Sequence, residues 1–199
     1  MLLAIHQPNF IPWMPYFEKL ALCDRFVILA HCQFEKGGFT NRCQVWGKWW
    51  TNPVQQGHGV DVMSKRYADG QRLVTTNLHW LCAIAMTLGI DTTKIVLDSK
   101  TRSTKTQRIA EICHAHEADA YLANPQALDA YLDVDELRAN GIRFVSFEAK
   151  LKRHPFEMFS EHGIERTKEL FWRAVGKSRE ELAVASTNGV PSEVPCASA

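Results

Sequence analysis

The sequence predicts an α/β protein with a doubly wound, mostly parallel sheet and helices on both faces. It starts with a strand–helix–strand unit: an apolar run at 2–6, helical spacing of apolar residues over 13–23, and a second apolar run at 26–30. Such a unit within thirty residues implies two parallel strands joined by a right-handed crossover. Short apolar runs and amphipathic stretches then alternate along the chain, which is the second indication of this fold class.

Local signals justify the individual elements. Pro12 and Pro15 suit the first turn of the helix over 13–23, because a missing N–H costs nothing there. CQVWGKWWTNPV predicts a hairpin that turns at Gly47, and residues 55–71 are expected to form an exposed loop. Further helices are predicted over 77–88 (ending at Gly89), 104–116, 125–138, 155–159 and 165–175, and further strands over 94–98, 118–123 and 142–148.

Length and composition fit one globular domain. Of 199 residues, 46% are hydrophobic and 23% charged, and we expect a single domain over 1–182 followed by a disordered tail over 183–199. The formal net charge of +1 gives no electrostatic footprint for a nucleic-acid partner. No apolar run is long enough for a membrane span, and the apolar start stops at His6, which argues against a signal peptide. Six cysteines without a CxxC pair then favour reduced thiols and a cytoplasmic protein.

Polar segments follow four of the predicted strands and should meet at one edge of the sheet. Ligands of doubly wound sheets bind at the carboxyl ends of the strands, near the point where the strand order reverses. The segments are His6-Gln7-Pro8-Asn9 after the first strand, His31-Cys32-Gln33 after the second, Lys100 to Arg108 after the third, and Ala123-Asn124-Pro125-Gln126 after the fourth. We therefore expect a ligand site at this edge.

Two interpretations of the strongest candidates stay open. His6 is either a strand-end histidine bonded to a backbone carbonyl, or a general acid/base or phosphate donor. Lys105 and Arg108 lie in the first turn of a helix that Ser103 or Thr104 can cap. These two cations are either solvated or partners of an anion bound at the helix N-terminus.

Asn41 and Arg42 are a further candidate, because an amide beside a guanidinium suits a phosphate or carboxylate. The alternative is an ordinary surface arginine. Cys32 beside His31 is a nucleophile beside a base only if both face the same way, and neighbours at a strand end usually face apart.

The aromatic and histidine clusters also allow more than one interpretation. Trp46, Trp49 and Trp50 are either a stacking platform for a base or sugar or the cover of a core edge. His114 and His116 are too close to share one helix face as metal ligands, so no metal site is predicted.

Several stretches form one recognisable pattern: IHQPNFIPWMPYFEKLALCDRFVIL, Gln33, Asn41-Arg42, WWTNPV, KTQRIAEICHAHEADAYL and ELFWRAVG, which together span 1–176. This pattern resembles the WbqC-like protein family. Members of that family tend to occur with genes for lipopolysaccharide O-antigen and specialised-metabolite pathways. The resemblance implies a transferase that modifies an amino sugar or a carrier-bound intermediate in polysaccharide or specialised-metabolite biosynthesis.

The chain departs from the family pattern in three places. Ala30-His31-Cys32-Gln33 stands where the family has Asp-Asp-Val-Gln, so a carboxylate position is lost. Pro15 replaces a glycine, and the family's middle segment is largely absent between Val60 and Asn77. A shortened lid or substrate lobe would change specificity or abolish activity.

The start of the chain is also similar to the HUP-type fold of nucleotidylyltransferases and pantothenate synthetases. Those enzymes hold ATP phosphates with an HxGH motif at the first helix, where this chain has Trp13-Met14-Pro15-Tyr16. Because both histidines are missing, plain nucleotidyl transfer is disfavoured even if the fold is shared.

We therefore predict a small-molecule transferase that acts on a sugar or carrier-linked substrate, with a carrier protein as a further partner. His6, Gln7 and Asn9 would carry the chemistry. The predicted binding residues are Gln33, Asn41, Arg42, Lys105, Arg108, Asn124, Trp13 and Tyr16. The cofactor stays unassigned, with a nucleotide or nucleotide-linked donor as one option. Two alternatives remain: an ATP-using enzyme of the nucleotidyl-transfer or ligase type, and a non-catalytic accessory binding protein.

Overall fold

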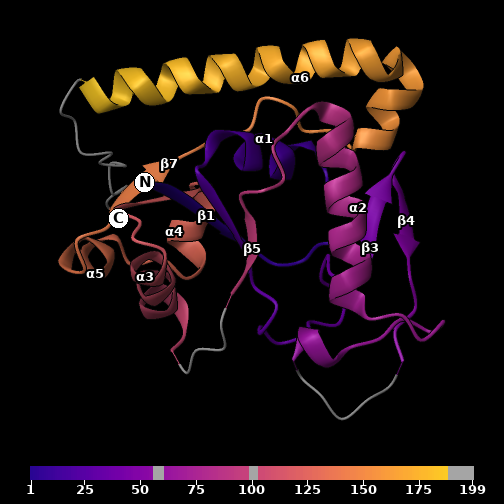
Figure 1. Cartoon of the computed structure of the whole chain (residues 1–199), viewed down its shortest axis with the longest axis horizontal. Coiled ribbons are helices and arrows are strands. Elements are labelled where there is room, and N and C mark those ends of the chain that lie inside the picture. The colour runs from indigo at the N-terminus through magenta and orange to yellow at the C-terminus, as the bar shows by residue number, and fades with distance from the viewer. Residues whose placement is uncertain (56–60, 99–102, 188–199) are drawn as a thin grey trace, which may run out of the picture.

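The computed structural model describes residues 1–55, 61–98 and 103–187, and its centre is a five-stranded parallel sheet (Figure 1). The strands are β1 (Leu2–His6), β2 (Arg25–Ile28), β5 (Ile95–Leu97), β6 (Ala120–Ala123) and β7 (Arg143–Ser146), in the order β5-β2-β1-β6-β7. Each neighbouring pair is parallel. The predicted doubly wound α/β class is confirmed.

Helices cover both faces of this sheet. One face carries α1 (Met14–Leu22), α2 (Leu73–Leu88) and α6 (Pro155–Thr187), and the other carries α3 (Lys105–Ala115), α4 (Gln126–Ala130) and α5 (Val134–Ala139). Successive side chains of β1 supply both cores, because Ala4 packs with the first set of helices while Leu3 and Ile5 pack with the second. Figure 1 shows α6 running along one side of the molecule, where it packs on α1 and α2.

The hairpin predicted around Gly47 is present as β3 (Arg42–Val45) and β4 (Lys48–Thr51). Trp46 and Gly47 both have positive φ, 49° and 70°, which is the two-residue turn that matches the twist of a hairpin.

The prediction of an exposed loop over 55–71 is wrong for the described part of that range. A short 3-10 helix, η1 (Val62–Ser64), follows Asp61, whose side chain caps the helix by accepting from the Met63 N–H. Val62 and Tyr67 are fully buried and form a small third core with Ala30 and residues at the start of α2. Residues 56–60 lie outside the described ranges.

The C-terminal helix is longer than predicted. The expected helices over 155–159 and 165–175 belong to one element, α6, which is interrupted at Gly163, where φ is +73° and ψ is 170°. Because α6 extends to Thr187, the first five residues of the expected tail are helical. Residues 188–199 lie outside the described ranges.

The single helix predicted over 125–138 is wrong, because α4 and α5 are separated by a break at Tyr131–Asp133. Thr106 of α3 holds this break: its Oγ1 donates to the Tyr131 carbonyl (3.2 Å) and accepts from the Asp133 N–H (2.9 Å). Asp133 then caps α5 by accepting two backbone N–H groups. The break therefore depends on a residue of another helix, which local sequence patterns do not reveal.

α2 begins at Leu73, four residues before its predicted start, and ends as expected at Gly89, whose φ is +76°. None of the described helices is long and apolar enough to cross a membrane. The cysteines in the described ranges, Cys23, Cys32, Cys43, Cys82 and Cys113, are free thiols.

Buried Asn77 of α2 anchors the segment that follows β1. Its side-chain amide donates to the carbonyls of Pro8 and Thr40, both at 2.7 Å, and its Oδ1 accepts from the Tyr67 hydroxyl. One residue thus ties together the turn after β1, the approach to β3 and the third core.

We expect Asn77→Leu to lower the free energy of unfolding by about 1–3 kcal/mol, since the buried Pro8 carbonyl loses its donor, while the Thr40 carbonyl and the Tyr67 hydroxyl keep only their mutual hydrogen bond (3.3 Å). Urea unfolding measures this. Thr75→Ala, at an exposed position of the same helix, should change the value by less than about 0.5 kcal/mol. Equal stability of the two variants would contradict the anchoring role.

Candidate functional site

The pairing of β1 with β6 ends early, at the point of the sheet where the strand order reverses. Pairing of β1 with β2 continues to His6↔Ile28, whereas its pairing with β6 ends at Ala4↔Leu122. The chain runs outward from β1 to β2 and β5, then returns to the other side of β1, so the switch point lies between β1 and β6. A cavity of about 500 Å³ lies there, a size in the range of roughly 300–1,000 Å³ typical of small-molecule sites.

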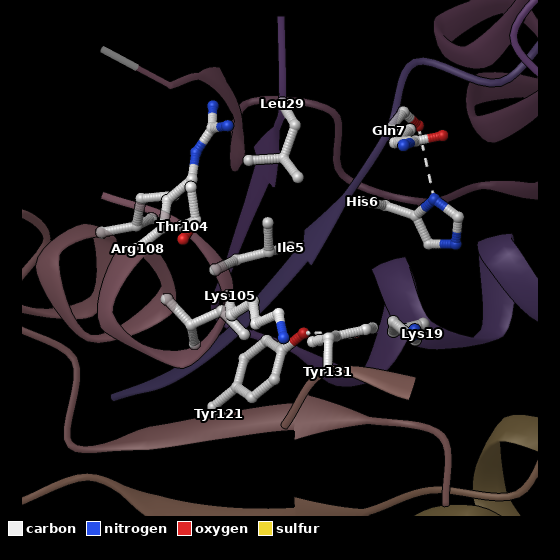
Figure 2. A pocket seen from close by; sticks show the side chains of 12 residues that line it. Ile5, His6, Gln7, Lys19, Leu29, Thr104, Lys105, Arg108, Tyr121 and Tyr131 are labelled. Carbon is white, nitrogen blue, oxygen red and sulfur yellow. Dashed lines mark hydrogen bonds between the residues drawn. The ribbon is translucent and has the colours of Figure 1, made fainter. Parts of the chain in front are cut away.

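The cavity brings together residues from β1, α1, the loop after β2, α3, β6 and the break after α4 (Figure 2). Its polar lining is His6, Gln7, Lys19, Thr104, Lys105 and Arg108, and Tyr121 and Tyr131 belong to its aromatic and apolar part. None of its described lining residues is a carboxylate. Sequence reasoning named His6, Gln7, Lys105 and Arg108, but missed Lys19 and the two tyrosines.

The Gln7 carbonyl determines which ring nitrogen of His6 carries the proton. This oxygen accepts from the Asn9 N–H (2.9 Å), the Tyr16 hydroxyl (3.0 Å) and His6 Nδ1 (3.3 Å). Because a carbonyl only accepts, Nδ1 carries the proton and Nε2 keeps its lone pair. Tyr16, which is buried, also packs its ring on the imidazole with centroids 4.3 Å apart. The imidazole is thus positioned with Nε2 as an acceptor.

The same surroundings keep His6 neutral. Burial, and after it the positive charge of Lys19, lower the pKa of His6 to about 3. Burial also lowers the pKa of Lys19 to about 8. Both groups therefore titrate outside their ordinary ranges in the absence of a ligand.

The N-terminus of α3 faces this cavity without a side-chain cap. Thr104 occupies the cap position but makes no capping hydrogen bond, and the Ser103 hydroxyl donates to Glu111 instead. The capping predicted for Ser103 or Thr104 is therefore wrong. Lys105, the first helical residue, is exposed and has a φ of +51°, a left-handed conformation that is strained for a side-chain-bearing residue. First-turn N–H groups without a side-chain cap and a cation together suit an anion.

Arg108 forms an ion pair that the sequence did not indicate. Its Nη2 pairs with the fully buried carboxylate of Asp98, at the end of β5, and donates to the His31 carbonyl (3.1 Å). Asp98 also accepts from the backbone N–H groups of Ala30 (2.7 Å) and His31 (3.3 Å). Arg108 thus lines the cavity while the buried carboxylate of Asp98 balances its charge.

The residues after β2 do not form a nucleophile–base pair. His31 Nδ1 lies 3.2 Å from Asp61, and the Cys32 thiol donates to the Leu29 carbonyl (3.1 Å). Burial raises the pKa of Cys32 to about 11, so it stays a thiol at neutral pH. Gln33 is exposed and forms a backbone bridge with Asp61, outside the cavity lining.

Asn9 and Trp13 line a second cavity of about 430 Å³ on the other side of the opening segment. Phe39, Gln44 and the stretch Lys152–His154 complete much of its wall. Trp13 is 48% exposed. The residues after β1 therefore line two different cavities: His6 and Gln7 line the first, and Asn9 and Trp13 line the second.

The other predicted binding residues lie outside the first cavity. Asn41 is buried and donates to the Asn52 carbonyl (3.1 Å), and Arg42 stacks 4.1 Å above the Trp49 ring and donates to Gly37. Asn124 directly follows β6, and its buried Oδ1 has no hydrogen-bond partner among the described residues.

The tryptophans of the hairpin are exposed. Trp46, Trp49 and Trp50 are each at least 40% accessible, and Trp50 contacts the Phe156 ring, with centroids 6.4 Å apart. They form an aromatic surface next to the second cavity, of which Gln44 and Gly47 line the edge.

Fold and cavity define a doubly wound α/β protein with a cavity at its switch point, whose described lining holds two lysines, an arginine and a histidine but no carboxylate. The model of the WbqC-like protein family matches residues 7–65 and 58–160, and the chain belongs to that family. It is 27% identical over 188 residues to Uncharacterized protein Rv1507c of Mycobacterium tuberculosis, and the alignment covers 73% of this chain and 81% of that protein. No solved structure matches the chain.

The low pKa of His6 predicts an acid-side loss of stability. An unfolded histidine binds a proton near pH 6.5, whereas folded His6 does so only near pH 3. The unfolded state therefore holds more protons in this window, and stability falls as the pH falls from 6.5 toward 3. Between pH 7 and 4.5 we expect the wild type to lose about 2 kcal/mol more than His6→Asn.

Urea unfolding at the two pH values measures this difference. His79→Asn, at an exposed position of α2, is the control and should follow the wild type. A His6→Asn curve parallel to that of the wild type would show that His6 is not held neutral.

The Asp98–Arg108 pair predicts strong coupling. Arg108→Met leaves a buried carboxylate without its counter-ion and should cost about 3–5 kcal/mol of unfolding free energy. A double-mutant cycle with Asp98→Asn should show that the two losses do not add. Arg138→Met removes an exposed pair with Asp135 and should cost under about 1 kcal/mol. Similar losses for both arginines would refute the buried pairing.

Proposed function

We propose that the protein is a cytoplasmic group transferase that binds a phosphate-bearing, nucleotide-linked donor in the cavity at the switch point. The observation that carries this proposal is the lining, in which neutral His6 faces the same space as Lys19 and Lys105, with no carboxylate among the described lining residues. Such a charge distribution attracts an anionic ligand.

The strand order supports a nucleotide-linked donor. Numbered among themselves, the five sheet strands run 3-2-1-4-5, which is the order of the first five strands in doubly wound dinucleotide-binding sheets. The donor phosphate would lie at the N-terminus of α3, next to Lys105. The rings of Tyr121 and Tyr131, whose hydroxyls are 3.3 Å apart, offer an aromatic wall for its base or sugar.

His6 would act on the acceptor. Its Nε2 would accept the proton of a hydroxyl or amine while that oxygen or nitrogen bonds to the transferred group, and the bond from this group to its phosphate-bearing leaving group breaks. With a pKa of about 3 the free imidazole is a weak base. A bound anion would raise that pKa, because it offsets the charge of Lys19. Donor binding would thus prepare His6 for proton transfer.

The reacting hydroxyl or amine of the acceptor would lie beside His6 in the first cavity, and the second cavity offers a separate surface for the remote sugar or carrier part of the acceptor. Trp13 presents an exposed aromatic face for a sugar ring, and Asn9 adds an amide for its hydroxyl groups. A sugar or carrier-linked acceptor of the kind expected for biosynthesis of polysaccharides or specialised metabolites fits these properties.

A thermal-shift screen with nucleotides, nucleotide sugars and acyl-CoAs tests the proposal, followed by a turnover assay with amino-sugar and carrier-linked acceptors. We expect a nucleotide-linked compound to stabilise the wild type. Lys105→Met should weaken its binding about tenfold, because one charge-assisted contact is lost. His6→Asn should still bind the compound but lose turnover.

Lys48→Met is the matched control, because Lys48 is exposed on β4 and lines neither cavity. If no phosphate-bearing compound stabilises the wild type, the proposal is wrong. Binding without turnover would indicate the accessory protein instead, and Mg²⁺-dependent binding of ATP would indicate the nucleotidyl-transfer class.

A further inference from the structure

Lys19 is buried without a hydrogen-bond or ion-pair partner in the described part of the chain. Its side chain belongs to α1 and is only 7% exposed, yet it lines the cavity at the switch point. Within the described ranges its ammonium makes no hydrogen bond or ion pair. A buried ammonium is costly unless a counter-charge or hydrogen-bond acceptors compensate it. The stability of the fold therefore does not explain why the Lys19 ammonium is buried.

Glu18, the preceding residue, shows what compensation looks like in the same helix. Its fully buried carboxylate accepts from the backbone N–H groups of Lys150 (3.0 Å) and Leu151 (2.7 Å). Two neighbouring residues of α1 are thus both buried and ionisable, but only the one that points away from the cavity has partners in the described protein.

We propose that Lys19 is the cation that pairs with an anionic group of the ligand inside this cavity, so that ligand binding completes an ion pair left open by the fold. The inference deepens the proposed function and rests on it for the identity of the donor. It does not require transfer chemistry.

The groups around Lys19 leave it open to an external anion. His6 faces it from β1 in the neutral state, and Cys23 at the end of α1 stays a thiol because burial raises the pKa of Cys23 to about 12. On the far side of the cavity, Lys105 and Arg108 are cationic, and Tyr121 and Tyr131 are phenols. No described group in this set supplies the negative charge that Lys19 lacks.

The proposal predicts that the affinity of the cavity for an anion depends on pH. Burial lowers the pKa of Lys19 to about 8 in the free protein, and an adjacent anion would raise it again. Above pH 8 the free amine must first be protonated, so the affinity for an anion falls as the pH rises. Between pH 7 and 9.5 we expect a loss of about 30-fold.

Sulfate is the probe, because it carries the charge of a phosphate and does not titrate in this range. Its binding to the full chain is measured by thermal shift or calorimetry from pH 7 to 9.5. The wild type should show the fall. Lys19→Met should bind weakly at every pH. Lys19→Arg should bind well with a flat profile, because arginine stays charged throughout.

Lys105→Met is the matched control, since it removes a cation from the same cavity and should weaken binding without moving the midpoint of the pH profile. A pH-independent wild type, or a fall that persists in Lys19→Arg, would overturn the proposal. If sulfate binds with the Lys19-dependent profile while no nucleotide-linked compound binds, the inference stands and the proposed donor is wrong. Folding of each variant is checked through its unfolding transition at pH 7.

Discussion

The unequal pairing of β1 with its two neighbours is the constraint on which the site depends. With β2 the register continues to the last residue of β1, and with β6 it stops at Ala4. The side of β1 that loses its partner early is also the side where the strand order reverses. His6 therefore ends a strand that is paired on one side and faces a cavity on the other, and the chain must turn at once.

That turn is held by hydrogen bonds from several elements. The Gln7 carbonyl accepts three donors, Asn77 of α2 binds the Pro8 carbonyl, and His154 near the start of α6 donates from Nε2 to the Ile11 carbonyl (3.1 Å). A backbone turn alone does not need an imidazole and an amide. The density of polar and aromatic residues after β1 is explained by these anchors and by the two cavities that the segment separates.

The fold was more predictable than the site. Apolar runs and helical periodicity reveal the β–α–β alternation, because those patterns are set by the two cores on either side of the sheet. The break before α5 was missed because it is stabilised by hydrogen bonds from Thr106, a residue of α3. Tyr131, which lines the cavity, lies in this break. Local periodicity carries no information about such non-local contacts.

The missed site residues follow the same logic. Lys19 was not singled out, because the helical spacing over 13–23 reveals only the apolar face of that helix. The cavity that Lys19 lines exists because β1 and β6 stop pairing before the end of β1. Asp98 ends a predicted strand, but its pairing with Arg108 joins the end of β5 to α3 across a loop. His6 lies at the switch-point cavity, because the end of the first strand of a doubly wound sheet is located there, and its chemical role stays a prediction.

The charge of the cavity depends on a carboxylate that lies beside Ala30 and His31. Asp98, on the neighbouring strand, places its carboxylate on the backbone N–H groups of Ala30 and His31. A carboxylate is therefore present at this corner, although it comes from β5 and is taken up by Arg108. Because Arg108 is balanced in this way, the positive character of the cavity comes from Lys19 and Lys105, which have no ion pair within the described ranges. Ligand recognition by charge must then act through these two lysines, one buried on α1 and one exposed on α3. They stand on different elements, so an anion that contacts both would bridge α1 and α3 across the point where the sheet opens.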